Sequence, residues 1–362
     1  MRIALVTAGC APPGLERTLA LAGALARAGT RVTVWSPARG GSLPPTDPAV
    51  RVRFVPVPDL PGEDRAAHER RTVTALGTAF AASGEEYDVV HARDASGARA
   101  VPACVRTVHH LDTAEPPAPP VAAPRALLCG SATVATEVRA RWGREASVVP
   151  DGVDVDRFAA AAGPGGAAGR GRWRARLGRF VLAVGGIEPR GGVLELVEAM
   201  ATVQLVRSEL LLVLAGEATR CADPRHRALL DARAQEREVY PLVLGPVPDD
   251  EHAALVAAAD VLVLSSTRQA AVAEGLEALA AGVPVVARDL PAVREVLGDA
   301  AAPAASTSAL AAGVLAATAP DPRRAAAGRA LAARHGWEAA ARAHLRCYEA
   351  LVAEGVRQPV RA

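Results

Sequence analysis

The sequence predicts an α/β protein made of two doubly wound parallel-sheet domains that face a central cleft. Short apolar runs alternate with helical segments from the first residue onward, as in parallel sheets covered by helices on both faces. The alternation starts again after a Gly/Ala-rich segment at residues 159–171. At 362 residues the chain is long for one hydrophobic core and sufficient for two domains of ordinary size.

The first half opens with a continuous apolar run at residues 2–7, which predicts a strand buried on both faces. Further strands are expected at 31–35, 50–57, 87–91, 104–109, 126–129 and 147–149, and helices at 15–28, 64–82 and 132–142. The Pro/Ala segment 116–124 cannot form the interior of a helix.

The second half repeats this order. Strands are expected at 180–184, 209–215, 241–244, 261–264 and 283–287, with helices at 193–206, 224–238, 251–259, before 281, within 307–334 and at 337–354. The predicted division is an N-terminal domain at 1–158, a linker at 159–171, a second domain at 172–336, and a closing helix and tail at 337–362.

Composition narrows the class of protein. The net charge is +2, with 41 basic residues that are all arginine and 39 acidic residues, so nothing points to a nucleic acid or an anionic membrane as partner. Five scattered cysteines form no metal-binding pattern and suit a reducing compartment. The chain has neither an 18-residue apolar run nor a signal-peptide pattern, so we expect a cytoplasmic protein without a transmembrane segment.

Two strand–turn–helix segments are the places where we expect function. Residues 261–289 read as a βαβ unit, and such units place ligands at the carboxyl ends of their strands. The turn 265–269 and the acid Glu277 in the following helix are the candidates there. The turn after strand 180–184 carries a second set of candidates, namely Gly185, Gly186, Arg190, Gly191 and Gly192.

Four stretches together resemble glycosyltransferase family 4, whose members have two Rossmann-like domains in the GT-B arrangement. The stretches are MRIALVT at the start, VRTVHHLD at 105–112, VPDGVDVDRF at 149–158, and LAVGGIEPRGG through AAGVPVVARD at 182–289. The chain looks most like a bacterial subfamily that carries VRTVHHLD and GGIEPRKG segments. The resemblance implies transfer of a sugar from a nucleotide diphosphate sugar to an acceptor, with retention of anomeric configuration and without a metal or other cofactor.

A nucleotide sugar requires fixed positive charge and backbone N–H donors around its two phosphates, where negative charge grows as the glycosidic bond breaks. We expect Arg190 to contact the diphosphate, helped by the N–H groups of Gly185, Gly186 and Gly191. The family has a lysine where this chain has Gly191, so one cation is missing. The alternative for Arg190 is a solvated loop arginine.

The resemblance places Glu277 at the second acid of the E-x7-E motif of the family, where it would contact the ribose. Gln269 stands at the first acid, and Ala270 and Val272 replace glycines that the family has there. An amide can hydrogen-bond a sugar hydroxyl but carries no negative charge to stabilise an oxocarbenium-like centre. The alternative for Glu277 is a solvated helix residue.

In the first half, His109 matches the histidine that the family uses for the donor sugar, although a histidine at a strand end can also be structural. Gly14 keeps half of a Gly-Gly pair of the first loop, and with Arg17 it marks the acceptor side. Asp151 replaces an asparagine of the family, and its role could be limited to capping a turn. His91 is a weaker candidate at another strand end.

The connections at 92–104 and 113–125 look shortened, as if a helix of the family were missing from the acceptor side.

The first hypothesis is a retaining glycosyltransferase with catalytic residues His109, Arg190 and Gln269. The second is a non-catalytic paralogue that binds nucleotide or acts as a partner subunit, because one acid, one cation and two glycines are replaced. A sugar-nucleotide epimerase is a third possibility, less favoured because no additional acid cluster is found.

Overall fold

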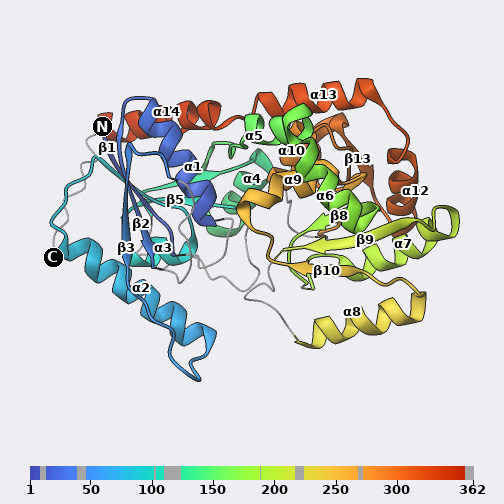
Figure 1. Cartoon of the computed structure of the whole chain (residues 1–362). Helices are drawn as coiled ribbons and strands as arrows, with labels where there is room; N and C mark the ends of the chain where they lie inside the picture. The colour runs from blue at the N-terminus through green and yellow to red at the C-terminus, as the bar shows by residue number, and fades with distance from the viewer. Residues whose placement is uncertain are drawn as a thin grey trace. The chain divides into compact units, whose positions relative to one another are not determined.

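The computed structural model describes residues 1–8, 14–38, 46–101, 103–109, 124–187, 189–216, 224–267 and 272–354. The chain divides into two units, which are described separately. Unit 1 comprises Met1–Gly152 together with Trp337–Ala362, and unit 2 comprises Val153–Gly336 (Figure 1).

Unit 1 contains a seven-stranded parallel sheet in the order β3-β2-β1-β4-β5-β6-β7. Its strands are β1 (Arg2–Val6), β2 (Arg31–Pro37), β3 (Val50–Val55), β4 (Val89–Ala92), β5 (Val105–Val108), β6 (Ala126–Cys129) and β7 (Ser147–Val148). Its helices are α1 (Gly14–Arg27), α2 (Arg65–Ala82), α3 (Ala95–Ala100), α4 (Ala132–Trp142) and α14 (Trp337–Ala353).

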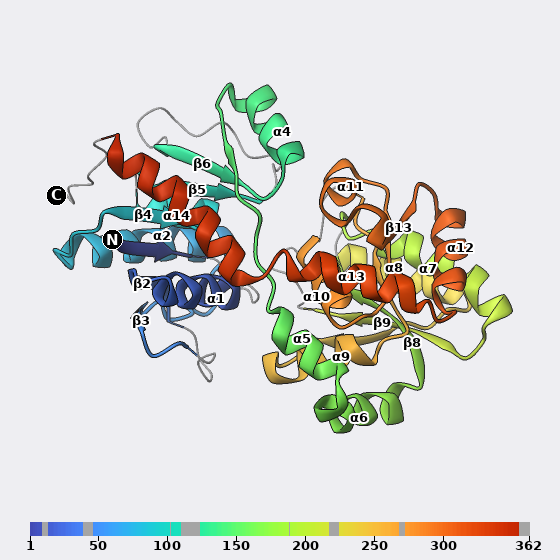
Figure 2. The same ribbon diagram turned by 90° about the horizontal axis from the view of Figure 1, so that it is seen from above.

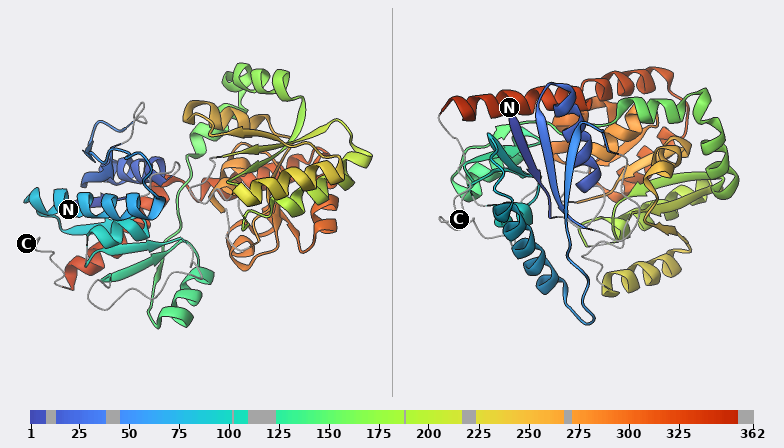
Figure 3. Two further views of the ribbon diagram at one scale, coloured as in Figure 1. Left: turned by 90° about the horizontal axis from the view of Figure 1, so that it is seen from below. Right: turned by 60° about the vertical axis from the view of Figure 1, so that its left-hand side comes forward.

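Alternate residues of β1 pack on opposite faces of this sheet, as the two-residue period of a strand requires. Ile3 and Leu5 belong to the cluster with α1 and α14, whereas Ala4 and Val6 belong to the cluster with α2 and α3. Figure 3 shows α14 (red) and α2 (light blue) on the two sides of the strands, and Figure 2 shows α14 beside α1. The continuous apolar run of the first strand thus has helices on both sides.

Unit 2 contains a six-stranded parallel sheet in the order β10-β9-β8-β11-β12-β13. Its strands are β8 (Arg179–Val184), β9 (Leu210–Ala215), β10 (Leu242–Gly245), β11 (Val261–Leu264), β12 (Val285–Arg288) and β13 (Ala301–Ala304). Its helices are α5 (Val155–Ala162), α6 (Ala167–Leu177), α7 (Val193–Val206), α8 (Pro224–Arg237), α9 (Asp249–Ala258), α10 (Val272–Ala280), α11 (Pro291–Leu297), α12 (Thr307–Ala317) and α13 (Pro322–Ala333).

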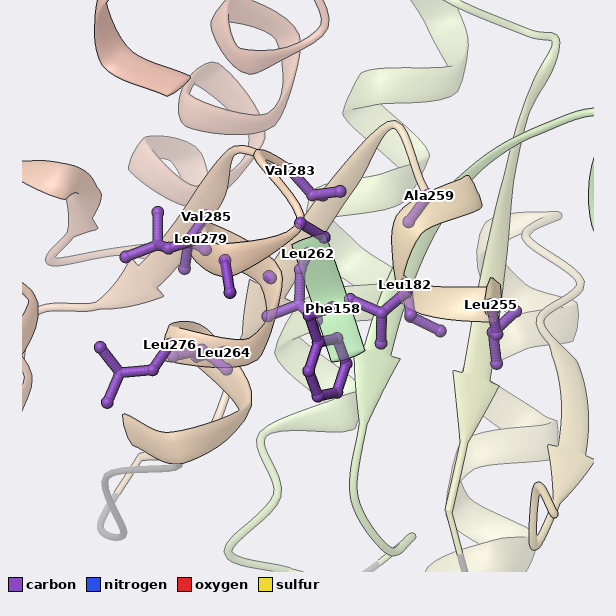
Figure 4. Packing of buried hydrophobic residues seen from close by; sticks show 14 of the residues in the cluster. Phe158, Leu182, Leu255, Ala259, Leu262, Leu264, Leu276, Leu279, Val283 and Val285 are labelled. Atoms are coloured by element: carbon purple, nitrogen blue, oxygen red, sulfur yellow. The ribbon is translucent and has the colours of Figure 1, made fainter. Parts of the chain in front are cut away.

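One face of the unit 2 sheet is closed by a core around Phe158 of α5. Leu182 of β8 and Leu262 of β11 point toward this ring, and Leu276 of α10 lies beside Leu264 (Figure 4). The buried side chains of this cluster are aliphatic apart from the rings of Phe158 and Phe180. A composition with few aromatic residues therefore still fills the core, because Leu, Val and Ala interdigitate at close range.

The expected linker at 159–171 is wrong. These residues form the end of α5, a 3-10 turn at Pro164–Gly166 and the start of α6, and the boundary between the units lies at Gly152/Val153 rather than at residue 158. Both helices are anchored: Arg170 donates to the carbonyl oxygens of Ala161 and Gly163, and Trp173 Nε1 donates to Glu251 at 2.9 Å. Alanine favours helix, and these anchors override the glycine content.

Other elements differ from expectation in detail. The connection between β4 and β5 contains α3, whose first turn is capped by the Asp94 carboxylate through the Gly97 N–H at 2.6 Å. A helix is therefore present where a bare link was expected. Helix α11 and strand β13 were also not anticipated. Strand β13 has the sequence AAPA and lies at the edge of its sheet. Residues 113–123 lie outside the described part of the chain.

Candidate functional site

Each sheet has a switch point, where the strand order reverses and ligands of such folds bind at the carboxyl ends. In unit 1 this point lies between β1 and β4, and in unit 2 between β8 and β11. The polar residues that follow these strands, together with His109 after β5 and Asp151 after β7, define two candidate regions. One is the nucleotide region of unit 2, and the other is the His109 region of unit 1.

In the nucleotide region, the loop after β8 is fastened to the turn after β11. Ser265 Oγ donates to the Gly191 carbonyl at 2.7 Å, and Ser266 Oγ donates to the Arg190 carbonyl at 3.0 Å. The Thr267 N–H also donates to the Arg190 carbonyl, at 3.1 Å. The two stretches singled out in the sequence are therefore one site, with the carbonyl groups of its Gly-rich loop held by serine and threonine.

Gly192 makes this contact possible. It has φ 65° and ψ 23°, and a Cβ at this position would lie 2.0 Å from the Ser265 carbonyl oxygen. No side chain caps the following helix, α7, so its first N–H groups and the positive end of its dipole lie beside the loop. A helix start of this kind, next to the half-buried Arg190, suits an anionic group.

The predicted residues Gly185, Gly186, Arg190 and Gly191 all lie in this loop. Gly186 is buried, whereas Gly185 is exposed. Gln269 and its neighbour Ala270 lie outside the described residues, so the predicted catalytic role of Gln269 stays a prediction. Val272 is the first residue of α10.

Glu277 lies on α10 with a partner that the sequence did not suggest. Its Oε2 is 3.0 Å from Nε2 of His252 on α9, and the side chains are 16% and 22% exposed. Burial alone would lower the pKa of His252, but the hydrogen bond and the charge of Glu277 outweigh burial and raise that pKa above its ordinary value. Glu277 is therefore not a solvated helix residue.

In the His109 region, the imidazole of His109 follows β5 and is held at both nitrogens. Its Nε2 lies 3.0 Å from the carbonyl oxygen of Arg93, and its Nδ1 lies 3.3 Å from Oδ2 of Asp151. Both partners are acceptors, so both contacts are complete only when each ring nitrogen carries a proton. In this arrangement each ring nitrogen of His109 faces an acceptor atom.

Asp151 joins His109 to a buried arginine. Its Oδ1 accepts from Nη2 of Arg93 at 3.0 Å, and the Arg93 side chain is only 4% exposed. Burial would raise the pKa of Asp151, yet the charge and hydrogen bond of His109 and the charges of Arg93 and Arg17 hold it well below its usual range. Asp151 is thus a charged anchor of the site rather than a simple turn cap.

A chain of buried hydrogen bonds continues from Arg93 into the core. Arg93 Nη1 donates to Oγ1 of Thr107 at 3.2 Å, and Thr107 Oγ1 lies 2.6 Å from Nε2 of His91. His91 Nδ1 lies 2.6 Å from the hydroxyl of Tyr348 on α14. Burial, followed by the nearby charge of Arg93, lowers the pKa of His91 well below its ordinary value, so this histidine is a neutral core residue and not a ligand-binding one.

The predicted acceptor-side residues lie at the start of α1. Gly14 is its first residue and accepts a hydrogen bond from Thr18 Oγ1 at 2.7 Å, and Arg17 follows in the first turn. The positive charge of Arg17 acts on Asp151. Of the predicted residues in unit 1, Arg17 and His109 are thus brought together electrostatically through Asp151.

Sequence reasoning missed Arg93 and His252 altogether and gave Asp151 only a minor role. Arg93 follows a buried strand directly, which is a usable signal for a position at the switch point. His252 has no such signal, because it lies 25 residues before Glu277 on another helix. A pairing of this kind depends on how α9 and α10 pack.

Among the described residues, no group of three or more His, Cys, Asp or Glu side chains could hold a metal ion. Within the same residues, no helix is both long and apolar enough to cross a membrane. Cys104 and Cys129 are buried free thiols, and burial raises the pKa of each to about 11. These two cysteines are core residues, as expected.

Two family models match the chain. Glycosyltransferase Family 4 matches residues 14–157, and Glycosyl transferases group 1 matches residues 175–331. The phosphatidyl-myo-inositol mannosyltransferase of Mycobacterium tuberculosis is 32% identical over 244 residues. That match covers 62% of this chain and 61% of the relative, so the chain spans less than two thirds of the length of this protein.

Solved structures show the same fold at low identity. Sucrose-phosphate synthase from Thermosynechococcus elongatus has a TM-score of 0.75 at 20% identity and covers 98% of this chain and 100% of its own. HepE from Anabaena, solved in complex with UDP and glucose, has a TM-score of 0.72 at 18% identity and covers 97% of this chain and 99% of its own. The two family models together match most of the chain, and the two parallel sheets and the solved structures show a GT-B fold. The chain therefore belongs to the family-4-type glycosyltransferases.

Proposed function

We propose that this protein transfers a sugar from a nucleotide diphosphate sugar to an acceptor, with retention of anomeric configuration and without a metal. The observation that carries the proposal is the fastening of the Arg190 loop to the turn after β11, beside the uncapped start of α7. This arrangement offers a guanidinium, backbone N–H groups and a helix dipole to a diphosphate. In this proposal, the nucleotide binds unit 2 with its diphosphate at Arg190 and its ribose at Glu277.

Catalysis would come from stabilising the leaving diphosphate and from positioning the sugar, not from a side-chain base. The contacts of His109 support this view, because both of its nitrogens face acceptor atoms. His109 and Arg17 would then act as fixed donors and charges. Contact of His109 with the donor sugar stays a prediction.

The names of the relatives suggest which compounds to test first. A mannosyltransferase that acts on phosphatidyl-myo-inositol and a structure that holds UDP and glucose point to GDP-mannose and UDP-glucose as first donors. An inositol phospholipid is the first acceptor to try. The compartment in which the protein works is proposed to be the cytoplasm, because its scattered cysteines suit a reducing compartment.

Binding of the donor tests the proposal directly. UDP, GDP and their sugars should raise the melting temperature at millimolar concentration, because a ligand of the native state stabilises it by mass action. Arg190→Ala should weaken diphosphate binding by about tenfold or more, as expected for loss of a charge-assisted hydrogen bond. Arg323→Ala, at an exposed position of α13, removes the same charge and should change little. Absence of any shift with all four compounds would refute the proposal.

The second candidate function is a non-catalytic paralogue that binds nucleotide. The replacement of the first acid of the motif by Gln269 favours it. Binding of a nucleotide sugar without hydrolysis or transfer, combined with turnover gained by Gln269→Glu together with Ala270→Gly and Val272→Gly, would identify this function. Slow hydrolysis of a donor by the unaltered chain would exclude it.

A further inference from the structure

His252 and Glu277 form a pair that joins two helices of unit 2. We infer that His252 is a positioning residue, which holds the Glu277 carboxylate in place for the ribose hydroxyls of the donor. This inference rests on the proposed function, since it assumes that Glu277 contacts ribose. It adds a residue on α9 to a site otherwise built from α10 and the loops after β8 and β11.

The geometry supports a fixed carboxylate. Nε2 of His252 and Oε2 of Glu277 are 3.0 Å apart, and neither side chain is more than 22% exposed. The His252 ring also forms a T-shaped contact with Phe158 of α5, at 5.8 Å between ring centroids and 89° between planes. The imidazole is therefore held by a core residue on one side while it binds the carboxylate on the other.

The side-chain rotamer of Glu277 decides whether its carboxylate can accept hydrogen bonds from both ribose hydroxyls. A glutamate has three side-chain torsions, and ordering them on binding costs conformational entropy. A carboxylate that is already hydrogen-bonded at one oxygen by a half-buried donor has lost much of this freedom before the ligand arrives. Preorganisation of this kind raises affinity without any additional contact to the ligand.

The charges around the pair are mixed. Glu277 and, more weakly, Glu274 of α10 favour the protonated ring, whereas Arg157 of α5 opposes it. Arg157 itself pairs with Asp249 at the start of α9, at 2.8 Å. His252 donates through Nε2 in its protonated form and in one neutral tautomer, so the hydrogen bond does not require the ring to be charged.

The test compares UDP with 2′,3′-dideoxy-UDP, which lacks the ribose hydroxyls, and GDP with its dideoxy form if GDP is the tighter ligand. His252→Leu should weaken binding of UDP by about tenfold. The same variant should leave binding of the dideoxy nucleotide unchanged, because that ligand makes no contact with Glu277. His252→Gln, which keeps an N–H donor at a similar distance from the backbone, should recover most of the UDP affinity.

A purely structural role for the pair gives a different pattern. Equal weakening of UDP and dideoxy-UDP by His252→Leu, or no weakening of either, would overturn the inference and leave the proposed function intact. Failure of both UDP and GDP to bind the unaltered protein would overturn the proposed function and this inference with it. An NMR titration of the His252 ring checks the pair without any nucleotide: Glu277→Gln should lower its pKa, and an unchanged titration would refute the pairing.

Discussion

The hydroxyl of Tyr348 lies 2.6 Å from Nδ1 of His91, although 257 residues separate them in the sequence. Both side chains are fully or nearly fully buried. This contact ties α14, the last helix of the chain, to β4 in unit 1. Through Thr107 it connects to Arg93, Asp151 and His109, so the final helix supports the His109 region from inside the core.

Removal of this hydroxyl tests that support. Tyr348→Phe keeps the ring but leaves Nδ1 of His91 without its partner, which should cost about 1–3 kcal/mol in the free energy of unfolding. Urea unfolding measures this change. Tyr240→Phe is the matched control, because Tyr240 is 68% exposed, and it should change stability by less than about 0.5 kcal/mol. Equal effects of the two variants would contradict the buried contact.

The pair of Arg93 and Asp151 should behave as a buried ion pair. Asp151→Asn leaves a guanidinium that is 4% exposed without its charged partner, which should cost about 3 kcal/mol in unfolding free energy at neutral pH. The folded-state pKa of Asp151 is lowered, so its contribution is present above the ordinary pKa of an aspartate and is lost as pH falls through the folded value. The deficit of the variant should therefore shrink in acid.

The control for this variant is Asp231→Asn. Asp231 pairs with Arg227 on the surface of α8, where the two side chains are 61% and 49% exposed. Exposed pairs contribute less than about 1 kcal/mol, so this change should have little effect. If Asp231→Asn lowers the unfolding free energy as much as Asp151→Asn does, burial of the Arg93–Asp151 pair does not explain its contribution to stability.

His344 of α14 should make the protein sensitive to acid. Burial lowers its pKa to about 4, below the ordinary value of 6.5, so the neutral form stabilises the fold above pH 6.5 and this contribution is lost as pH falls toward 4. Between pH 7 and pH 4.5 the loss of unfolding free energy from this group is about 2–3 kcal/mol. His344→Gln removes the titration, so its unfolding free energy should fall less over this range. If the unfolding free energies of the unaltered protein and of His344→Gln fall equally between pH 7 and pH 4.5, the prediction is contradicted.

Gly192 and Gly143 form a matched pair for testing the nucleotide region. Their backbones are alike, at φ 65° and ψ 23° against φ 64° and ψ 24°, so alanine pays a similar conformational cost of about 1–2 kcal/mol at each. A Cβ at Gly143 meets nothing within 4 Å, whereas at Gly192 it meets the Ser265 carbonyl oxygen. Gly192→Ala should therefore lower the unfolding free energy, measured in urea, by about 1–3 kcal/mol more than Gly143→Ala does. It should also weaken UDP binding, which Gly143→Ala should not.

Much of the fold follows from local patterns. The sequence placed helix α4 at residues 132–142, helix α7 at 193–206 and strand β6 at 126–129, and the structure has these elements at the same bounds. Each has a clear apolar period or clear stop signals. β13 (AAPA) and α3 (ASGARA) were not found, because neither contains the large apolar side chains that mark a strand or a helix face.

The candidate site also has a part that local sequence patterns predict and a part that they do not. The Gly-rich loop with Arg190 could be found from sequence, because turns after buried strands lie at the carboxyl edge of a parallel sheet. The partners of Asp151 and Glu277 could not. Arg93 lies 58 residues before Asp151, and His252 lies 25 residues before Glu277.

The sequence by itself determined the two α/β repeats and the loops at their strand ends, because alternation of apolar runs and turn residues acts over a few neighbouring positions. Only the tertiary structure decided that His109 is held between Arg93 and Asp151, that His252 binds Glu277, and that α14 returns to unit 1. These contacts depend on the order of strands in each sheet and on how helices pack over it. They join residues whose spacing along the chain carries no signal of their meeting.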